Sequence, residues 1–165
     1  MTFDFIKILQ YWFPNDKFNK SWFAGEKNDE YIIHNFMEDY HNAINTYITN
    51  KLDFSNIDML IAFIIITDQF NRHINRHDEE TKRINDEYAL KISRYILENN
   101  MDLEQPVNKK IFILMPYRHK FTDDSYKVVL ERIGIYEEIH GSDDKLLNKF
   151  KKVTHLKIIE HNLFK

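Results

Sequence analysis

Apolar residues recur along most of the chain at intervals of three to four, which is the spacing of amphipathic helices. The run at residues 111–114 would suit a strand by itself, but its flanks favour helix. The pattern therefore predicts an all-α fold in which helices pack as antiparallel pairs. Seven helices are expected, at residues 4–13, 29–51, 55–75, 84–99, 105–116, 122–140 and from residue 142 onward.

Prolines and short polar side chains mark where these helices begin and end. Pro14 stops the first helix, while Asp29 and Ser55 are the expected N-terminal caps of the second and third. Pro106 suits the first turn of the fifth helix, and Pro116 is expected to kink or end that helix. With only 3 Gly and 3 Pro in 165 residues, the connections are expected to be short.

The C-terminal part of the chain predicts the last two helices. The sixth helix is capped by Thr122 or Asp123 and stops before Gly141, and the seventh begins at Ser142. An apolar stripe predicts the buried face of the seventh helix, formed by Leu146, Phe150, Val153, Leu156 and Ile159.

The third helix combines the most hydrophobic run of the chain, residues 57–66, with a charged continuation at 67–77. On a helix turning about 100° per residue, Asp68 lies one turn beyond Ile64 and shares its buried face. Arg72 follows Asp68 at the i, i+4 spacing that favours an ion pair. Charge enters a core only when it is paired, so this segment is the first candidate for a functional site.

Two interpretations of this segment stay open. In the functional one, Asp68 orients Arg72, and the guanidinium groups of Arg72 and Arg76 bind a carboxylate or a phosphate. Gln69 and Arg76 occupy the adjacent shoulder of the helix, and Arg76 is the arginine expected to stay free for a ligand. In the structural interpretation, Asp68 and Arg72 form a buried ion pair that ties helices together.

Three histidines, His73, His77 and His119, are further candidates for a site. His73 and His77 have the i, i+4 spacing of helical zinc ligands, but no Glu follows His73 and His77 lies at or beyond the helix end. We therefore expect a solvated histidine pair and no metal. His119 follows the break at Pro116, where it forms either the wall of a site or an ordinary surface residue.

Large aromatic residues are concentrated near the N-terminus. Trp12 stands between Tyr11 and Phe13, and Trp22 precedes Phe23 in an expected loop. Tryptophan is usually highly buried, so these residues are expected in the core, where either tryptophan can also line a pocket.

Composition narrows the function classes. One domain is expected to span residues 1–165, since this length supports a single sizeable core. The absence of Cys excludes disulfides, thiolate zinc sites and cysteine nucleophiles. No signal peptide is recognised, and the longest apolar run is half the ~20 residues that a membrane span needs. We therefore expect a soluble cytoplasmic protein without a membrane partner.

Charge and motifs do not favour nucleic acid or a cofactor. The net charge of -3 provides no strong field towards a polyanion. The lysines of the last helix are diluted by acidic residues and lack the arginines and stacking aromatics of a nucleic-acid surface. No Gly-rich phosphate loop, nucleophile elbow or Ser/His/Asp grouping is present, so no cofactor is expected.

Several short motifs occur in a fixed order along the chain: Tyr11-Trp12-Phe13, Trp22-Phe23, Asp68-Gln69-Phe70-Asn71-Arg72, Met115-Pro116 with His119, and His155 with Ile158-Ile159. Together these motifs resemble the bacterial domain-of-unknown-function family number 924. The resemblance covers essentially the whole chain. It implies an all-helical fold similar to tetratricopeptide repeats, a right-handed superhelix, and no established activity. It also matches Asp68, Gln69, Phe70 and Arg72 to the family's Asp-Gln-Phe-Pro-Arg-Asn signature.

The chain departs from the family pattern at several places. Asn71 replaces the proline of the signature, and His73 replaces its asparagine. His119-Lys120-Phe121 stands where the family has His-Ser-Glu, so an acidic partner is missing. The family ends in Phe-Gly-Arg-Phe-Pro-His-Arg-Asn, whereas this sequence reads Asn162-Leu163-Phe164-Lys165. A family site that uses the terminal segment is therefore expected to be incomplete here.

Two hypotheses for function follow. The first is a helical binding or scaffold module that holds a small anion or a peptide in a groove between paired helices. Its expected site residues are Asp68, Gln69, Arg72, Arg76 and His119, with Trp12 and Trp22. The alternative is an enzyme acting on a small anionic substrate, with His119 as acid or base, Asp68 in support and the arginines binding the anion. The enzyme hypothesis requires Arg72 and His119 to line one pocket.

Overall fold

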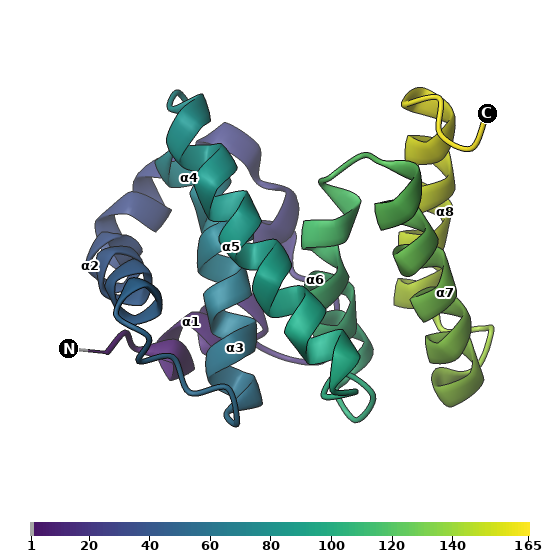
Figure 1. Ribbon diagram of the computed structural model, residues 1–165, viewed down its shortest axis with the longest axis horizontal. Helices are drawn as coiled ribbons and strands as arrows, with labels where there is room; N and C mark the ends of the chain where they lie inside the picture. The colour runs from purple at the N-terminus through teal and green to yellow at the C-terminus, as the bar shows by residue number, and fades with distance from the viewer. Residues whose placement is uncertain (1) are drawn as a thin grey trace.

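A computed structural model describes residues 2–165 and contains helices but no strand among them (Figure 1). The all-α prediction is confirmed. The α-helices are α1 Phe5–Trp12, α2 Asp29–Ile48, α3 Ile57–Ile64, α4 Asn71–Ile74, α5 Glu79–Glu98, α6 Val107–Arg118, α7 Asp123–His140 and α8 Lys145–Glu160. A π-helical segment, Ile65–Phe70, joins α3 to α4. Two 3₁₀ turns, Lys20–Phe23 and Gly25–Asn28, lie between α1 and α2.

Helix α3 lies at the centre of the N-terminal part of the molecule, where it packs against α1, α5 and α6. Helix α6 in turn contacts α7 and α8, which form a hairpin at the opposite end from α2 (Figure 1). The right-handed superhelix expected from the resemblance to tetratricopeptide repeats stays a prediction. Within residues 2–165, no helix combines the length and the apolar character that crossing a bilayer requires.

Two segments are buried along almost their whole length. Every residue from 59 to 66 is buried, as expected for the most hydrophobic run of the chain. Helix α6 is also buried almost all round, from Val107 to Tyr117. Aromatic side chains link the two, since Trp12 packs edge-to-face on both Phe70 and Phe112. The remaining, amphipathic helices therefore pack around these two buried segments.

Several helix ends differ from the predictions because a neighbouring side chain forms the cap. The backbone N–H and the hydroxyl of Ser55 bind Asp53, so Asn56 caps α3 by accepting from the Met59 N–H at 3.1 Å. Helix α5 begins at Glu79, earlier than expected, because Asp78 accepts from the Thr81 N–H. Asp144 rather than Ser142 caps α8, and Asp29 lies inside α2 without acting as its cap.

Other predicted ends are confirmed or extended. Thr122 caps α7 and forms a capping box with Ser125, and Gly141 ends α7 with φ 90°. Pro116 does not end α6, which continues to Arg118. Proline removes a single backbone hydrogen bond, and the apolar side chains buried around α6 outweigh that loss.

The predicted buried stripe of α8 is only partly right. Phe150 is 5% exposed, and Leu146 and Val153 are half-buried, but Leu156 is 55% and Ile159 is 75% exposed. Helix α8 packs mainly on α6 and α7, and α6 ends at Arg118. The last turns of α8 therefore extend past α6, although the start of α7 stays beside them.

Candidate functional site

The π-helical segment places Asp68 inside the core. A π-helix has a wider turn than an α-helix and leaves backbone carbonyls for other partners, and such segments are frequent at functional sites. Thr67 Oγ1 donates to the carbonyl of Phe63 at 2.7 Å, and Arg72 Nη1 donates to the carbonyl of Asp68 at 2.6 Å. Both side chains thus satisfy groups that the irregular turn exposes.

The carboxylate of Asp68 is 0% exposed and receives donors from three side chains. His119 Nδ1 lies 2.8 Å from Oδ1, Arg72 Nη1 lies 3.2 Å from Oδ1, and Gln69 Nε2 lies 2.7 Å from Oδ2. Burial by itself raises the pKa of Asp68, but the charges of His119 and Arg72, with the hydrogen bonds from His119 and Gln69, hold it at about 2. Asp68 is therefore ionised at neutral pH.

A second carboxylate, Asp86 of α5, shares the guanidinium of Arg72. Arg72 Nη1 donates to Asp86 Oδ1 at 3.0 Å. Burial raises the pKa of Asp86 more than Arg72 lowers it, and the charge of Asp68 adds to the rise. The guanidinium of Arg72 thus pairs with two carboxylates and favours the ionised form of both.

An amide network supports the site from the side opposite His119. Asn71 is 0% exposed, and its Nδ2 donates to the carbonyl of Lys82 at 2.9 Å. Its Oδ1 accepts from Asn75 and Asn85, and both of these also donate to the Tyr40 hydroxyl. This buried network fixes α5 against the helix that carries Asp68 and Arg72.

Arg76 and His73 form a separate cluster. Arg76 binds both carboxylate oxygens of Asp29, with distances of 2.6 and 2.8 Å, and His73 Nδ1 lies 2.7 Å from the same carboxylate. The hydrogen bond from Arg76 lowers the pKa of Asp29 against the effect of burial, and His73 assists. The expectations that Arg76 stays free and that His73 is solvated are therefore wrong, because the start of α2 supplies a carboxylate. His77 is exposed, as expected.

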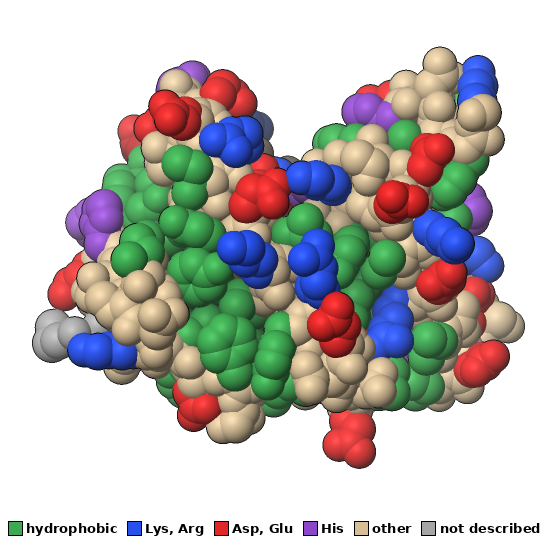
Figure 2. Space-filling model, viewed as in Figure 1, with side chains coloured by type: hydrophobic (Ala, Val, Ile, Leu, Met, Phe, Trp, Pro, Cys, Tyr) green, Lys and Arg blue, Asp and Glu red, His purple; other side chains and the backbone are tan. Residues whose placement is uncertain are grey.

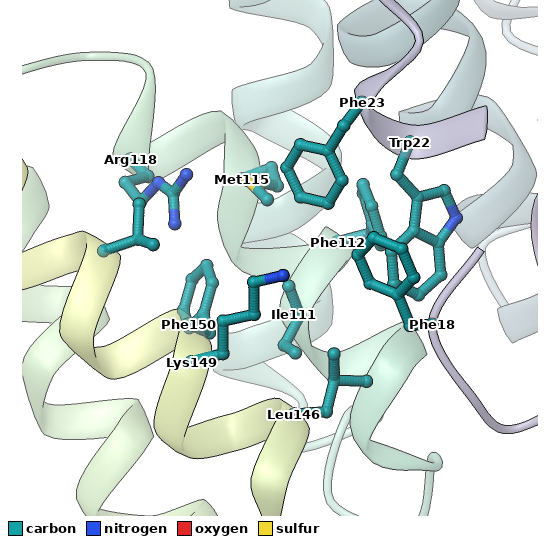
Figure 3. A pocket seen from close by; sticks show the side chains of 11 residues that line it. Phe18, Trp22, Phe23, Ile111, Phe112, Met115, Arg118, Leu146, Lys149 and Phe150 are labelled. Atoms are coloured by element: carbon teal, nitrogen blue, oxygen red, sulfur yellow. The ribbon is translucent and has the colours of Figure 1, made fainter. Parts of the chain in front are cut away.

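The predicted site residues therefore fall into distinct groups. Asp68, Gln69, Arg72 and His119 meet around one carboxylate. Trp12 lies in the core at 0% exposure. Trp22 donates its indole N–H to the Trp12 carbonyl at 2.8 Å and lines a different, apolar pocket (Figure 3).

Sequence reasoning missed Asp86, Asn71 and Asn85. Asn85 precedes Ala89 by four residues and Ile92 by seven, which places a polar side chain on the buried face of α5. That position was a readable signal of a buried network. The contact between Asp86 and Arg72 had none, because it depends on how α5 crosses the π-helical segment.

A pocket opens beside the cluster. It has a volume of about 210 Å³ and is lined by Arg83, Asp86, Glu87, Leu90, Pro116, His119 and Lys120. Figure 2 shows the surface hollowed between the tops of α4 and α5 and the connection from α6 to α7, with side chains of both charges on its floor. His119 and Asp86 belong both to this wall and to the buried cluster. Arg72 contacts Asp86 but does not line the pocket. The condition that Arg72 and His119 line one pocket, which the enzyme hypothesis required, is therefore not met.

His119 presents a free edge to this pocket. The ionised Asp68 accepts a hydrogen bond, so Nδ1 carries the hydrogen. No described residue forms a hydrogen bond with Nε2. This nitrogen can accept a proton or, in the protonated ring, donate to an anion. Among residues 2–165, no three His, Asp or Glu side chains converge in a way that could hold a metal ion.

Comparison with known proteins identifies a family but no characterised relative. No curated protein matches the chain, and no solved structure matches it. One family model, described as a bacterial protein of unknown function (DUF924), matches residues 8–162. Because this match covers nearly the whole sequence, the chain belongs to the DUF924 family of bacterial proteins.

Proposed function

We propose that this chain binds a small anionic molecule, a carboxylate or a phosphate, in the pocket beside His119. The observation that carries the proposal is the state of His119. Its Nδ1 is bound to the fully buried Asp68, and its Nε2 has no partner among the described residues. A side chain fixed at one end and open at the other is organised for a ligand.

The charges around the pocket favour an anion at this position. Lys120 pairs with Glu87 at 2.7 Å, and Asp86 pairs with Arg72. Arg83 is exposed and forms no ion pair with any residue from 2 to 165. Arg83 and His119 are therefore the pocket side chains that remain available to bind a ligand. The planar guanidinium of Arg83 can donate two parallel hydrogen bonds to a carboxylate or a phosphate.

The size of the pocket favours a small molecule over a peptide. A cavity of about 150 Å³ admits benzene. The pocket beside His119, at about 210 Å³, therefore has room for a metabolite of several heavy atoms.

One observation favours an enzyme as the second candidate. A buried carboxylate that orients an imidazole, leaving Nε2 free as an acceptor, is the arrangement of a general base. The residues that line the pocket include no Ser, Thr or Cys. The chemistry favoured by this arrangement is activation of a water molecule rather than formation of a covalent intermediate.

Calorimetric titration with succinate and with inorganic phosphate tests the binding proposal. We expect saturable binding of at least one probe, with affinity lowered about tenfold by Arg83→Gln or His119→Gln, each of which removes a charged hydrogen bond. Lys91→Gln is the matched control, since it removes an exposed charge from α5 outside the pocket. The proposal would be refuted if neither probe binds saturably, or if Lys91→Gln lowers the affinity as much as Arg83→Gln and His119→Gln do.

Turnover separates the two candidates. Hydrolysis of p-nitrophenyl phosphate by the wild type, lost in His119→Gln and kept in Lys91→Gln, would establish catalysis. Binding that depends on His119, in the absence of turnover, would support the binding function and exclude catalysis of this reaction.

A further inference from the structure

A second pocket lies between the N-terminal loop, α6 and α8, away from the carboxylate cluster (Figure 3). Its walls are formed mainly by Phe18, Trp22 and Phe23 of the loop, by Phe112 and Met115 of α6, and by Phe150 of α8. Its volume is about 80 Å³.

The loop wall of this pocket is held in place by hydrogen bonds. Trp22 Nε1 and Asn19 Nδ2 both donate to the carbonyl of Trp12, at 2.8 and 3.0 Å. Asn108 Nδ2 of α6 donates to the carbonyl of Asn15 at 2.9 Å. The wall is therefore preformed, which reduces the entropy that a ligand would have to remove.

Two aromatic rings at the edge of the pocket remain uncovered. Phe23 is 65% exposed and Phe18 is 44% exposed, and their rings stack at 5.4 Å. Together with the apolar lining, they form a contiguous apolar surface rather than scattered residues. Such a surface on a folded domain commonly marks a binding site.

Two cations face this apolar surface without an acidic partner. The guanidinium of Arg118 lies 4.8 Å from the ring centre of Phe150. The ammonium of Lys149 lies 4.5 Å from the ring centre of Phe18. Within residues 2–165, neither side chain forms an ion pair, in contrast to Arg72. Figure 3 shows both head groups beside the pocket.

Arg118 is partly buried and has no acidic side chain paired with it among the described residues. Burial lowers the pKa of Arg118, and the nearby Tyr126 and Asp68 only partly oppose that change. A guanidinium removed from water is costly unless an anion pairs with it. The ring of Phe150 provides Arg118 with weaker, cation–π stabilisation than a carboxylate would.

We propose that this pocket binds a medium-chain alkyl carboxylate, with the chain among the aromatic rings and the carboxylate between Arg118 and Lys149. The apolar walls require an apolar body, and the two unmatched cations require a negative head group. The enclosed volume of about 80 Å³ is smaller than an octanoate, so one part of the chain enters the pocket and the rest lies over the exposed rings of Phe18 and Phe23.

This pocket is separate from the pocket beside His119, since the two share no lining residue. Arg118 and His119 are neighbours in sequence, but the imidazole binds Asp68 while the guanidinium lies over Phe150. Variants of Lys149 or Arg118 therefore test this proposal, and variants of Arg83 or His119 test the other.

Calorimetric titration of the full chain with octanoate provides the test. We expect one saturable site, with affinity rising about fourfold for each methylene from hexanoate to octanoate. Lys149→Gln and Arg118→Gln should each weaken octanoate about tenfold, through loss of a charge-assisted hydrogen bond. Lys152→Gln removes an exposed charge of α8 outside the pocket and should leave the affinity unchanged. Lys149 is exposed, so its replacement keeps the fold even if that of Arg118 does not.

Three outcomes would overturn the proposal. The first is no saturable binding of octanoate at millimolar concentration. The second is 1-octanol binding as tightly as octanoate, which would show that the cations contribute nothing. The third is a concentration-dependent dimer that Lys149→Glu abolishes and octanoate does not affect, which would assign the pocket to a second copy of the chain.

Discussion

Replacing Asp68 by asparagine tests the central ion cluster, because it keeps the shape of the side chain and removes its charge. Each pKa unit corresponds to about 1.4 kcal/mol. The difference between the ordinary pKa of 3.8 and the pKa of about 2 in the fold therefore stabilises the protein by about 2.5 kcal/mol when Asp68 is ionised. Asp68→Asn should lower the free energy of unfolding at pH 7 by about that amount.

The sign of the pH dependence follows from the direction of the pKa change. The folded-state pKa of Asp68 is the lower one, so its contribution is complete above the unfolded value of 3.8 and is lost as the pH falls towards 2. The stability gap between wild type and Asp68→Asn should stay constant from pH 7 to about pH 5 and shrink below about pH 4.

Urea unfolding followed by circular dichroism, repeated at several pH values, measures this gap. Asp16→Asn is the control, because Asp16 is exposed in the loop after α1 and should change stability by less than about 0.5 kcal/mol. A gap at pH 7 no larger than that of the control would refute the argument. So would a gap that does not shrink in acid.

Three further predictions concern the supports of the fold and use the same unfolding assay. Asn56→Ala should lower the free energy of unfolding by about 1 kcal/mol through loss of the α3 cap, and Ser55→Ala should lower it by less. A larger loss for Ser55→Ala than for Asn56→Ala would identify Ser55 as the cap. Asn85→Ala should cost about 2 kcal/mol, because the buried Tyr40 hydroxyl and Asn71 amide lose a donor, and a cost near zero would mean that water enters the network. Gly141→Ala should destabilise the fold by about 1 kcal/mol or more, because φ is 90° and the added Cβ would lie 2.9 Å from a side-chain oxygen. Gly134→Ala should instead stabilise the fold by about 0.5–1 kcal/mol, because Gly134 lies inside α7 with open space around its Cβ position.

The periodicity of apolar residues was sufficient to predict the helical fold and the buried run at residues 57–66, but not the whole buried face of α8. Helical spacing is a local property, so α3 and α6 were recognisable from residues within a few turns. The burial of Asp68 followed in the same way from its position one turn after Ile64. Helix ends were less predictable, because Ser55, Asn56 and Asp53 compete for the same cap hydrogen bonds and only one arrangement wins.

The candidate site was only half visible in the sequence. Asp68 with Arg72 is a contact within one helix, separated by four residues. His119 was a candidate, but its contact with Asp68 spans 51 residues, and the contact of Arg76 with Asp29 spans 47. No spacing rule connects residues so far apart.

The sequence by itself determined that the chain is helical, that the run at residues 57–66 is buried, and that a charged pair enters the core after Ile66. The tertiary structure decided which cations are neutralised. Arg72 and Arg76 find carboxylates on α5 and α2, while Arg118 and Lys149 find only aromatic rings. The physical reason is the sequence separation over which each interaction acts. Helix formation depends on neighbours within four residues, whereas the pairing of a buried charge depends on the helix that packs over it.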